Sequence, residues 1–169
     1  MDYSVRLGKE NDLEQILAVI DSGRKQLASR NIPQWRNNEG PNKAVIMTDL
    51  QLEEGYVLLE DKEIVGYGTI TKGKQEGYEP IKNGEWLGEE AYVSLHRIAI
   101  KETIKERGKG QFLLSYLILE AQKQGYTDIR IDTHPLNIPM QKVIQKAGFN
   151  FRGEIVLPVT AGERLGYQL

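Results

Sequence analysis

Hydrophobic residues recur along the chain with two spacings, one typical of helices and the other typical of strands. The helical spacing is clearest after Asn11 and Asp12, two common helix caps, and this first helix is expected to fade near residue 27. Its apolar positions are Leu13, Ile16, Leu17 and Ile20. The same spacing, with Pro, Asn and Gly near the ends, predicts further helices over residues 41–50, 111–124 and 137–148.

Apolar runs bounded by turn residues predict strands over residues 3–7, 55–60, 63–70, 91–100, 128–133, 149–157 and 164–169. The element order is therefore strand, two helices, three strands, helix, strand, helix and two strands. This mixture places the chain in the α/β (α+β) class. Residues 71–90 form a long polar loop, and loops of this length in compact domains are often functional.

A turn of sequence Arg-Gly-Lys-Gly, residues 107–110, joins the fourth predicted strand to the third predicted helix. Glycine lets the backbone approach an anion, and the N–H groups of a helix's first turn point toward it. Arg107 and Lys109 add positive charge, so the turn predicts a phosphate site. Gln111 and Phe112 come next, where a Walker loop needs Lys-Ser/Thr and the dinucleotide fingerprint needs further glycines.

Composition narrows the function classes. The chain has 169 residues, which suits a single domain over residues 1–169. Its net charge of −2 gives no electrostatic basis for binding nucleic acid or an anionic membrane. It contains no cysteine, which excludes disulfides and thiolate sites and fits a cytoplasmic location. The two histidines and the scattered carboxylates have no metal-ligand spacing, so we expect no metal.

The glycine turn resembles the acyl-CoA site of the GNAT superfamily of acyl-CoA-dependent N-acyltransferases. The family motif is Arg/Gln-x-x-Gly-x-Gly/Ala, and residues 107–112 match it except that Phe112 replaces a small residue. The strand at residues 95–100 matches the family's fourth strand. Asn137, followed by Lys-Ala-Gly-Phe at residues 146–149, matches a second family motif. With the element order, the resemblance covers nearly the whole chain.

The resemblance implies a mixed, mostly antiparallel central sheet of about seven strands flanked by about four helices, with strands 4 and 5 splayed apart. The implied co-substrate is acetyl-CoA. Its pyrophosphate would lie on the glycine turn, and its pantetheine arm would pair with the fourth strand much as an added strand would. The implied cofactor contacts are Ile98, Ala99, Ile100, Arg107, Gly108, Lys109, Gly110, Gln111, Phe112, Asn137 and Lys146.

One departure from the family bears on mechanism. Many members carry a Tyr seven residues after the Asn, and this Tyr protonates the leaving CoA thiolate; here that position is Ile144. A thiol has a reference pKa of about 8.5 and needs only weak help from an acid. Another group, or solvent, could therefore take this role.

His96 is the candidate base. An acceptor amine with a reference pKa of about 10.4 is almost wholly protonated at neutral pH, whereas histidine, with a reference pKa of about 6.5, is mostly neutral. Strand alternation predicts that Tyr92, Ser94, His96 and Ile98 share one face, and in some family members a Glu at the position of Ser94 is the base. The backbone N–H of Ile98 is the candidate donor to the thioester oxygen. The alternative for His96 is a buried structural histidine.

His134 ends the fifth predicted strand, so in the resembled fold it flanks the same cleft as His96. It is a candidate for binding substrate or for protonating the thiolate. The alternative is that it caps the turn before Pro135. Asp132 could orient a histidine or hold a cationic amine, or it could be solvated or paired with Arg130.

The acceptor site is expected beneath the long connections, which carry three large aromatic residues and an acidic bias suited to a cationic amine. These aromatic residues could grip the substrate or anchor the loops to the core. The candidate substrate contacts are Trp35, Tyr78, Trp86, Tyr92, Ser94 and Asp132.

The sequence therefore predicts an N-acetyltransferase that moves an acetyl group from acetyl-CoA to the primary amine of a small molecule or peptide. One alternative is a non-catalytic acyl-CoA-binding sensor or regulatory protein, which Ile144 and Phe112 favour. A second is another phosphate-ligand protein, which would bind nucleotides and not CoA. A homodimer could form through the C-terminal strands.

Overall fold

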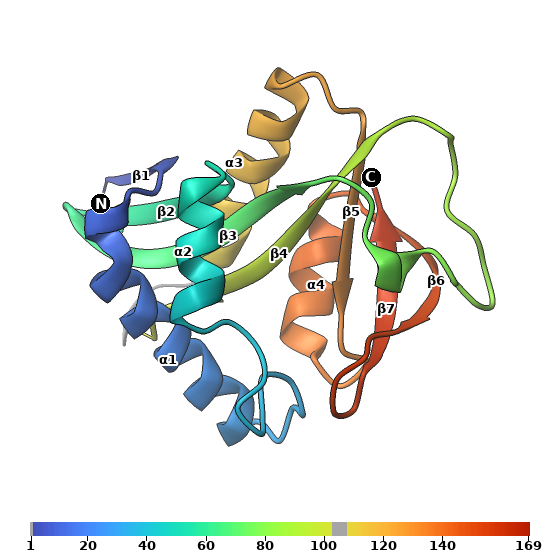
Figure 1. The fold of residues 1–169 in the computed structure, drawn as a ribbon, viewed down its shortest axis with the longest axis horizontal. Helices are drawn as coiled ribbons and strands as arrows, with labels where there is room; N and C mark the ends of the chain where they lie inside the picture. Colours follow the sequence, from blue (N-terminus) through green and yellow to red (C-terminus); the bar gives the residue numbers. More distant parts are fainter. Residues whose placement is uncertain (1, 103–107) are drawn as a thin grey trace.

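A single twisted sheet runs through the molecule (Figure 1). The computed structural model describes residues 2–102 and 108–169. The strands are β1 (Tyr3–Leu7), β2 (Gly55–Glu60), β3 (Glu63–Lys72), β4 (Tyr92–Ile100), β5 (Asp128–Thr133), β6 (Asn150–Val156) and β7 (Glu163–Gln168). They form a seven-stranded sheet in the order β1-β2-β3-β4-β5-β7-β6. Neighbours are antiparallel except for the parallel pair β4 and β5, which confirms the predicted mixed sheet.

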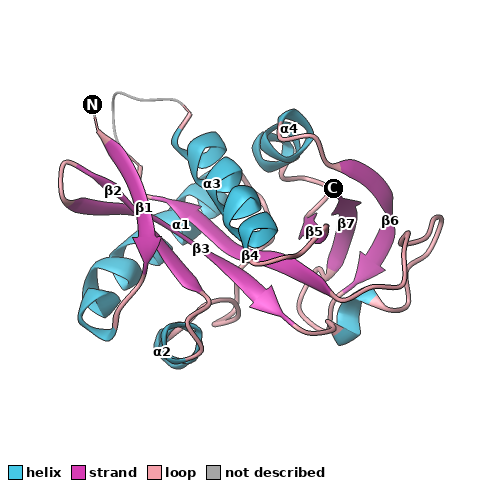
Figure 2. Ribbon diagram, turned by 90° about the horizontal axis from the view of Figure 1, so that it is seen from above, coloured by secondary structure: helices cyan, strands magenta, loops and turns pink. Residues whose placement is uncertain are grey.

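Helices cover both faces of the sheet. They are α1 (Leu13–Ser29), α2 (Lys43–Gln51), α3 (Lys109–Lys123) and α4 (Ile138–Lys146). In Figure 2, α3 and α4 lie on one face and α2 lies on the other, and α1 packs with α2 in the same hydrophobic cluster. Successive β2 residues serve the two cores, because Val57 packs with Ile16 of α1 and Leu58 packs with Leu113 of α3. None of the described helices is long and apolar enough to cross a membrane.

Local capping places the starts of three helices. Asn42 Oδ1 accepts from Val45 N at 2.9 Å, and Asn137 Oδ1 accepts from Met140 N at 3.2 Å. The third predicted helix, α3, begins at Lys109 rather than at residue 111. Gly108 caps it with a left-handed φ of 98°, a conformation that glycine adopts without strain.

The sheet opens between β4 and β5, as predicted. Only the segment Tyr92–Leu95 of β4 pairs with β5, where its partners are residues 128–131. A β-bulge falls directly after that point, because Thr69 of β3 pairs with His96 while Tyr67 pairs with Ala99. At this point β4 has one residue more than β3, and Arg97 within the bulge adopts a left-handed conformation with φ 55°.

The bulge changes which side chains share a face of β4. His96 lies opposite Thr69, on the face that α1 and α2 cover. Ile98 packs instead in the cluster of Leu113 and Leu117, on the face that α3 and α4 cover. The prediction that His96 and Ile98 share one face is therefore wrong, because strand alternation does not continue across an inserted residue.

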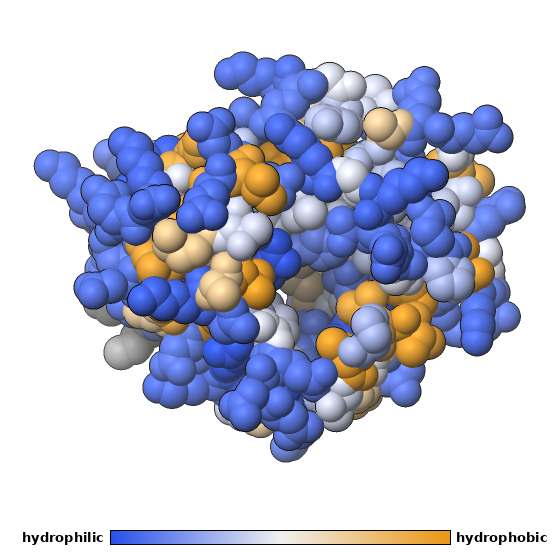
Figure 3. Space-filling model, in the orientation of Figure 1, coloured by the Kyte–Doolittle hydropathy of each residue, from blue (hydrophilic) through white to orange (hydrophobic). Residues whose placement is uncertain are grey.

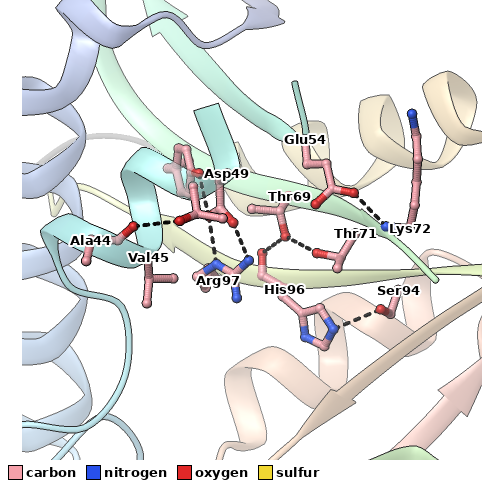
Figure 4. Close-up of polar contacts among 12 residues, drawn as sticks. Ala44, Val45, Asp49, Glu54, Thr69, Thr71, Lys72, Ser94, His96 and Arg97 are labelled. Carbon is pink, nitrogen blue, oxygen red and sulfur yellow. Dashed lines mark hydrogen bonds and ion pairs between the residues drawn. The ribbon is translucent and has the colours of Figure 1, made fainter. Parts of the chain in front are cut away.

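A buried carboxylate holds the bulge in place (Figure 4). Arg97 donates from Nε to Asp49 Oδ2 at 2.8 Å and from Nη2 to Oδ1 at 2.6 Å. The Tyr67 hydroxyl donates to the same Asp49 Oδ2 at 2.8 Å, and burial together with the negative charge of Asp49 raises the pKa of Tyr67. Asp49 belongs to α2 and is 3% exposed. Its hydrogen bonds to Arg97 therefore tie α2 directly to the point where the sheet opens.

The substitution Asp49→Ala is expected to lower the free energy of unfolding by about 2–4 kcal/mol, because it leaves a guanidinium and a buried hydroxyl without their acceptor. Urea unfolding measures the loss. Asp21→Ala is the matched control, since Asp21 pairs with Lys25 on the exposed surface of α1, and its effect should stay below about 0.5 kcal/mol. Similar small losses in both variants would show that strand pairing alone holds the bulge.

Candidate active site

The gap between β4 and β5 holds a cavity of about 450 Å³. Its walls come from the splayed part of β4, the end of β5, the start of α3, α4, the second half of α1 and the α1–α2 and β6–β7 loops. Figure 3 shows a hollow at the centre of the face that carries α1 and α2. The cavity therefore lies where pairing in the sheet stops.

Part of the predicted cofactor set lines this cavity, namely Ile98, Ala99, Ile100, Gly110 and Asn137. The backbone from His96 onward has no pairing with β5, although the carbonyl of Ile100 accepts from Gln26 Nε2 at 2.8 Å. The first turn of α3 reaches the same wall at Gly110, and the capping residue Gly108 has no side chain to cover that turn. A strand edge and a helix N-terminus thus meet at one site.

The side chain of Lys109 does not face the cavity. It is 3% exposed, and its Nζ lies 2.7 Å from Glu60 Oε2. The prediction that this ammonium attracts a pyrophosphate is corrected, because its charge is used in a buried ion pair within the fold. Arg107, the other cation of the predicted turn, lies outside the described residues.

Three other predicted cofactor residues lie outside the cavity lining. Gln111 donates from Nε2 to the carbonyl of Val143 at 3.1 Å, which joins α3 to α4. The ring of Phe112 packs against Tyr3 with a centroid distance of 5.7 Å. Lys146 is exposed at the end of α4. Their side-chain contact with a cofactor stays a prediction.

His96 lines the cavity at the start of the splay, with its ring 19% exposed. Its Nε2 lies 2.8 Å from Ser94 Oγ (Figure 4), and its Nδ1 lies 3.9 Å from Asp132 Oδ2. Burial lowers the pKa of His96, while Asp132 acts in the opposite direction and Arg97 in the same one. The imidazole is therefore neutral at neutral pH, and Ser94 fixes its orientation.

Asp132 is a shared acceptor at the end of β5. The Tyr78 hydroxyl donates to Oδ2 at 2.5 Å, and Arg164 Nε lies 3.6 Å from Oδ1. The alternative pairing with Arg130 does not occur, because that guanidinium donates twice to Asp128. Sequence reasoning missed Arg164, which is 5% exposed and lines the cavity; burial lowers its pKa. No local pattern indicates its role, since only the pairing of β5 with β7 brings it to Asp132.

His134 does not line the cavity. Its Nδ1 accepts from the backbone N–H of Leu136 at 3.0 Å, so it caps the turn around Pro135 as the structural alternative held. Burial lowers its pKa, Arg164 lowers it further, and Glu163, at 3.9 Å from Nε2, opposes this. In the described part of the chain, no three His, Asp or Glu side chains are grouped to hold a metal ion.

Two of the six predicted substrate contacts line the cavity, Trp35 and Asp132. The four that do not are Tyr78, Trp86, Tyr92 and Ser94. Tyr78 is 1% exposed and stacks on Trp86 at 5.4 Å, and the guanidinium of Arg130 lies over both Trp86 and Tyr92. These rings anchor the long β3–β4 loop to the core, and their contact with a substrate has no support from the cavity.

Two loops that the sequence does not connect meet at one rim of the cavity. Glu39 accepts from the backbone N–H of Thr160 at 3.0 and 3.1 Å, and Asn37 Nδ2 donates to Thr160 Oγ1 at 3.4 Å. Asn137 Nδ2 donates to Gln34 Oε1 at 2.9 Å. The α1–α2 loop is thereby joined to the β6–β7 loop and to the start of α4, across the splay.

Residues 24–149, which include most of the cavity wall, match the acetyltransferase (GNAT) family. The chain belongs to the GNAT family. Membership implies acyl transfer from CoA. No curated protein matches the chain.

Solved structures agree with this GNAT assignment. A GNAT acetyltransferase of Streptococcus agalactiae is 30% identical to this chain and superposes with a TM-score of 0.85. The alignment covers 98% of this chain and 94% of the other. A GNAT acetyltransferase of Listeria monocytogenes is 18% identical, with coverages of 99% and 94% and a TM-score of 0.74. The NatC complex bound to Gag peptide and CoA is 14% identical, with coverages of 100% and 98% and a TM-score of 0.71. The last two show similarity of fold alone.

The two histidines should titrate separately by NMR, both with a pKa below 6.5, because burial disfavours the charged ring. Asp132→Asn is expected to lower the pKa of His96 further, since it removes a negative charge that favours the imidazolium. Glu163→Gln is expected to do the same to His134. Each variant is the control for the other, and a shift of both histidines by one substitution would contradict their separate environments.

Proposed function

We propose that this chain transfers the acetyl group of acetyl-CoA to the primary amine of a small molecule or peptide by direct attack. The observation that carries the proposal is one cavity bounded by three features. They are a strand edge that leaves its neighbour, the first turn of a helix, and a neutral histidine beside a partly buried carboxylate. The strand edge can pair with an amide-bearing arm, the helix turn can bind a phosphate, and the histidine can take a proton from an amine.

Acetyl-CoA matches the first two features. The first-turn N–H groups of a helix bind phosphate oxygens, and a Cβ added at Gly110 would meet Ile100 Cγ1 only at 3.9 Å, so the wall there is open. The pantetheine amides are able to pair with the backbone of residues 98–100 as an added strand. The NatC complex supports the proposal, since it binds CoA on a similar fold.

His96 is the proposed base. For a lysine-like amine, reaching the free form at pH 7 costs about 4–5 kcal/mol. We assign the resting ring proton to Nε2, which then donates to Ser94 Oγ and leaves the lone pair on Nδ1. When Nδ1 takes the amine proton, the imidazolium forms 3.9 Å from Asp132, whose negative charge stabilises it. The backbone N–H of Ile98 is the proposed donor to the thioester oxygen.

A non-catalytic acyl-CoA sensor or regulator is the second candidate. It is favoured by Ile144, which is fully buried in the core at the position where many family members carry a Tyr that acts as the general acid. A chain of this kind would bind acetyl-CoA and release no thiol in the presence of any amine.

Acetyl-CoA is expected to raise the thermal stability of the protein, by about 2.7 kcal/mol at a hundred times its dissociation constant. Gly110→Asp should remove most of this gain, because it places a carboxylate beside the phosphate site. Gly110→Asn is the matched control of equal size without the charge, and it should keep most of the gain. ATP and NAD serve as comparison ligands. A gain with a nucleotide alone would overturn the proposed cofactor.

The substitution His96→Gln is expected to lower the rate of CoA thiol release by roughly 10²–10⁴-fold, because it removes the base, while acetyl-CoA binds as before. The assay uses acetyl-CoA with a panel of small primary amines and amine-bearing peptides. His134→Asn is the control, since its amide oxygen can still accept from Leu136 and the residue lies outside the cavity lining. Full activity in the His96 variant would exclude it as the base.

A further inference from the structure

Thr133, the last residue of β5, has a hydroxyl that no described part of the chain engages in a hydrogen bond. The residue is 1% exposed and lines the cavity. Its Oγ1 has no hydrogen-bond partner among residues 2–102 and 108–169. A buried hydroxyl without a partner is costly, so natural structures retain one where a ligand or water completes it.

The hydroxyl lies on the opposite side of the sheet from the proposed base. Along β5, Thr133 shares its face with Ile131, which packs in the cluster of Leu113 and Ile144 beneath α3 and α4. Asp132, between them in sequence, points to the other face and lies near His96. The gap between β4 and β5 therefore has a base on one side and an unused hydroxyl on the other.

A hydrogen-bond donor on that second side would assist the reaction. Acyl transfer forms a bond from the amine nitrogen to the thioester carbon, breaks the carbon–sulfur bond and leaves the electron pair on sulfur. If the amine enters on the side of His96, the sulfur leaves on the side of α3, where the helix start receives the phosphates. Ile144 offers no polar atom there.

We propose that the Thr133 hydroxyl donates a hydrogen bond to the sulfur of coenzyme A and stabilises the thiolate as it leaves; this inference rests on the proposed function. The amine proton goes to His96 and then to solvent. Thr133 keeps its own proton, and the thiolate departs as such or is protonated by solvent. A donor of this kind is sufficient, because a thiol with a reference pKa of about 8.5 is a good leaving group.

Product binding tests this without knowledge of the acceptor. Dissociation constants of CoA and of desulfo-CoA, which lacks the thiol, are measured by calorimetry from about pH 7 to about pH 9.5, the range in which the thiol ionises. The ratio used is the affinity for CoA divided by the affinity for desulfo-CoA, and it cancels every titration that affects both ligands equally. In the wild-type protein, the affinity for CoA relative to desulfo-CoA should rise by roughly five- to tenfold over this pH range. The reason is that the thiolate accepts the hydrogen bond more strongly than the thiol.

Two variants and one control assign the effect. Thr133→Val keeps the shape and removes the donor, so the ratio should stay flat or fall with pH. Thr133→Ser retains the donor and should restore the rise. Ser94→Ala removes a buried hydroxyl on the other face and should leave the rise intact.

The outcomes separate this inference from the proposed function. A ratio that rises equally in Thr133→Val, or stays flat in the wild-type protein, overturns the role of Thr133 while CoA binding stands. If neither CoA nor desulfo-CoA binds, the proposed cofactor is wrong and the role of Thr133 falls with it.

Discussion

The site depends on one break in strand pairing. β4 and β5 pair for four residues and then separate, and the bulge at Arg97 marks the separation. Backbone groups left without a strand partner are costly when buried, so such a gap needs support from elsewhere. Asp49 supplies part of it by holding the Arg97 guanidinium and the Tyr67 hydroxyl. Asp49 thereby ties α2 and β3 to the residue at which the sheet opens.

The same bulge divides the cavity into two sides. On one side lie His96 and Asp132, with Tyr78 and Arg164 holding the carboxylate. On the other lie Ile98 and the start of α3. A strand without the extra residue would place His96 and Ile98 on one face.

Much of the fold was predictable from the sequence. Spacings of apolar residues within a few turns, together with Pro, Asn and Gly near the helix ends, correctly predicted the helices and the order of the elements along the chain. The glycine turn correctly predicted a helix start. Predictions for single side chains were weaker. Lys109 is paired with Glu60, and Tyr78 and Trp86 are core anchors, because burial and ion pairing depend on partners far away in the chain.

The sequence by itself determined the elements, their order and the family, because periodicity, caps and short motifs act over a few neighbouring residues. The tertiary structure alone decided which residues meet. Arg164 reaches Asp132 through the pairing of β5 with β7, and Glu39 reaches Thr160 across 121 positions. The bulge decided which face each residue of β4 serves. Such choices follow from the packing of whole elements against one another, a property that no local stretch of sequence contains.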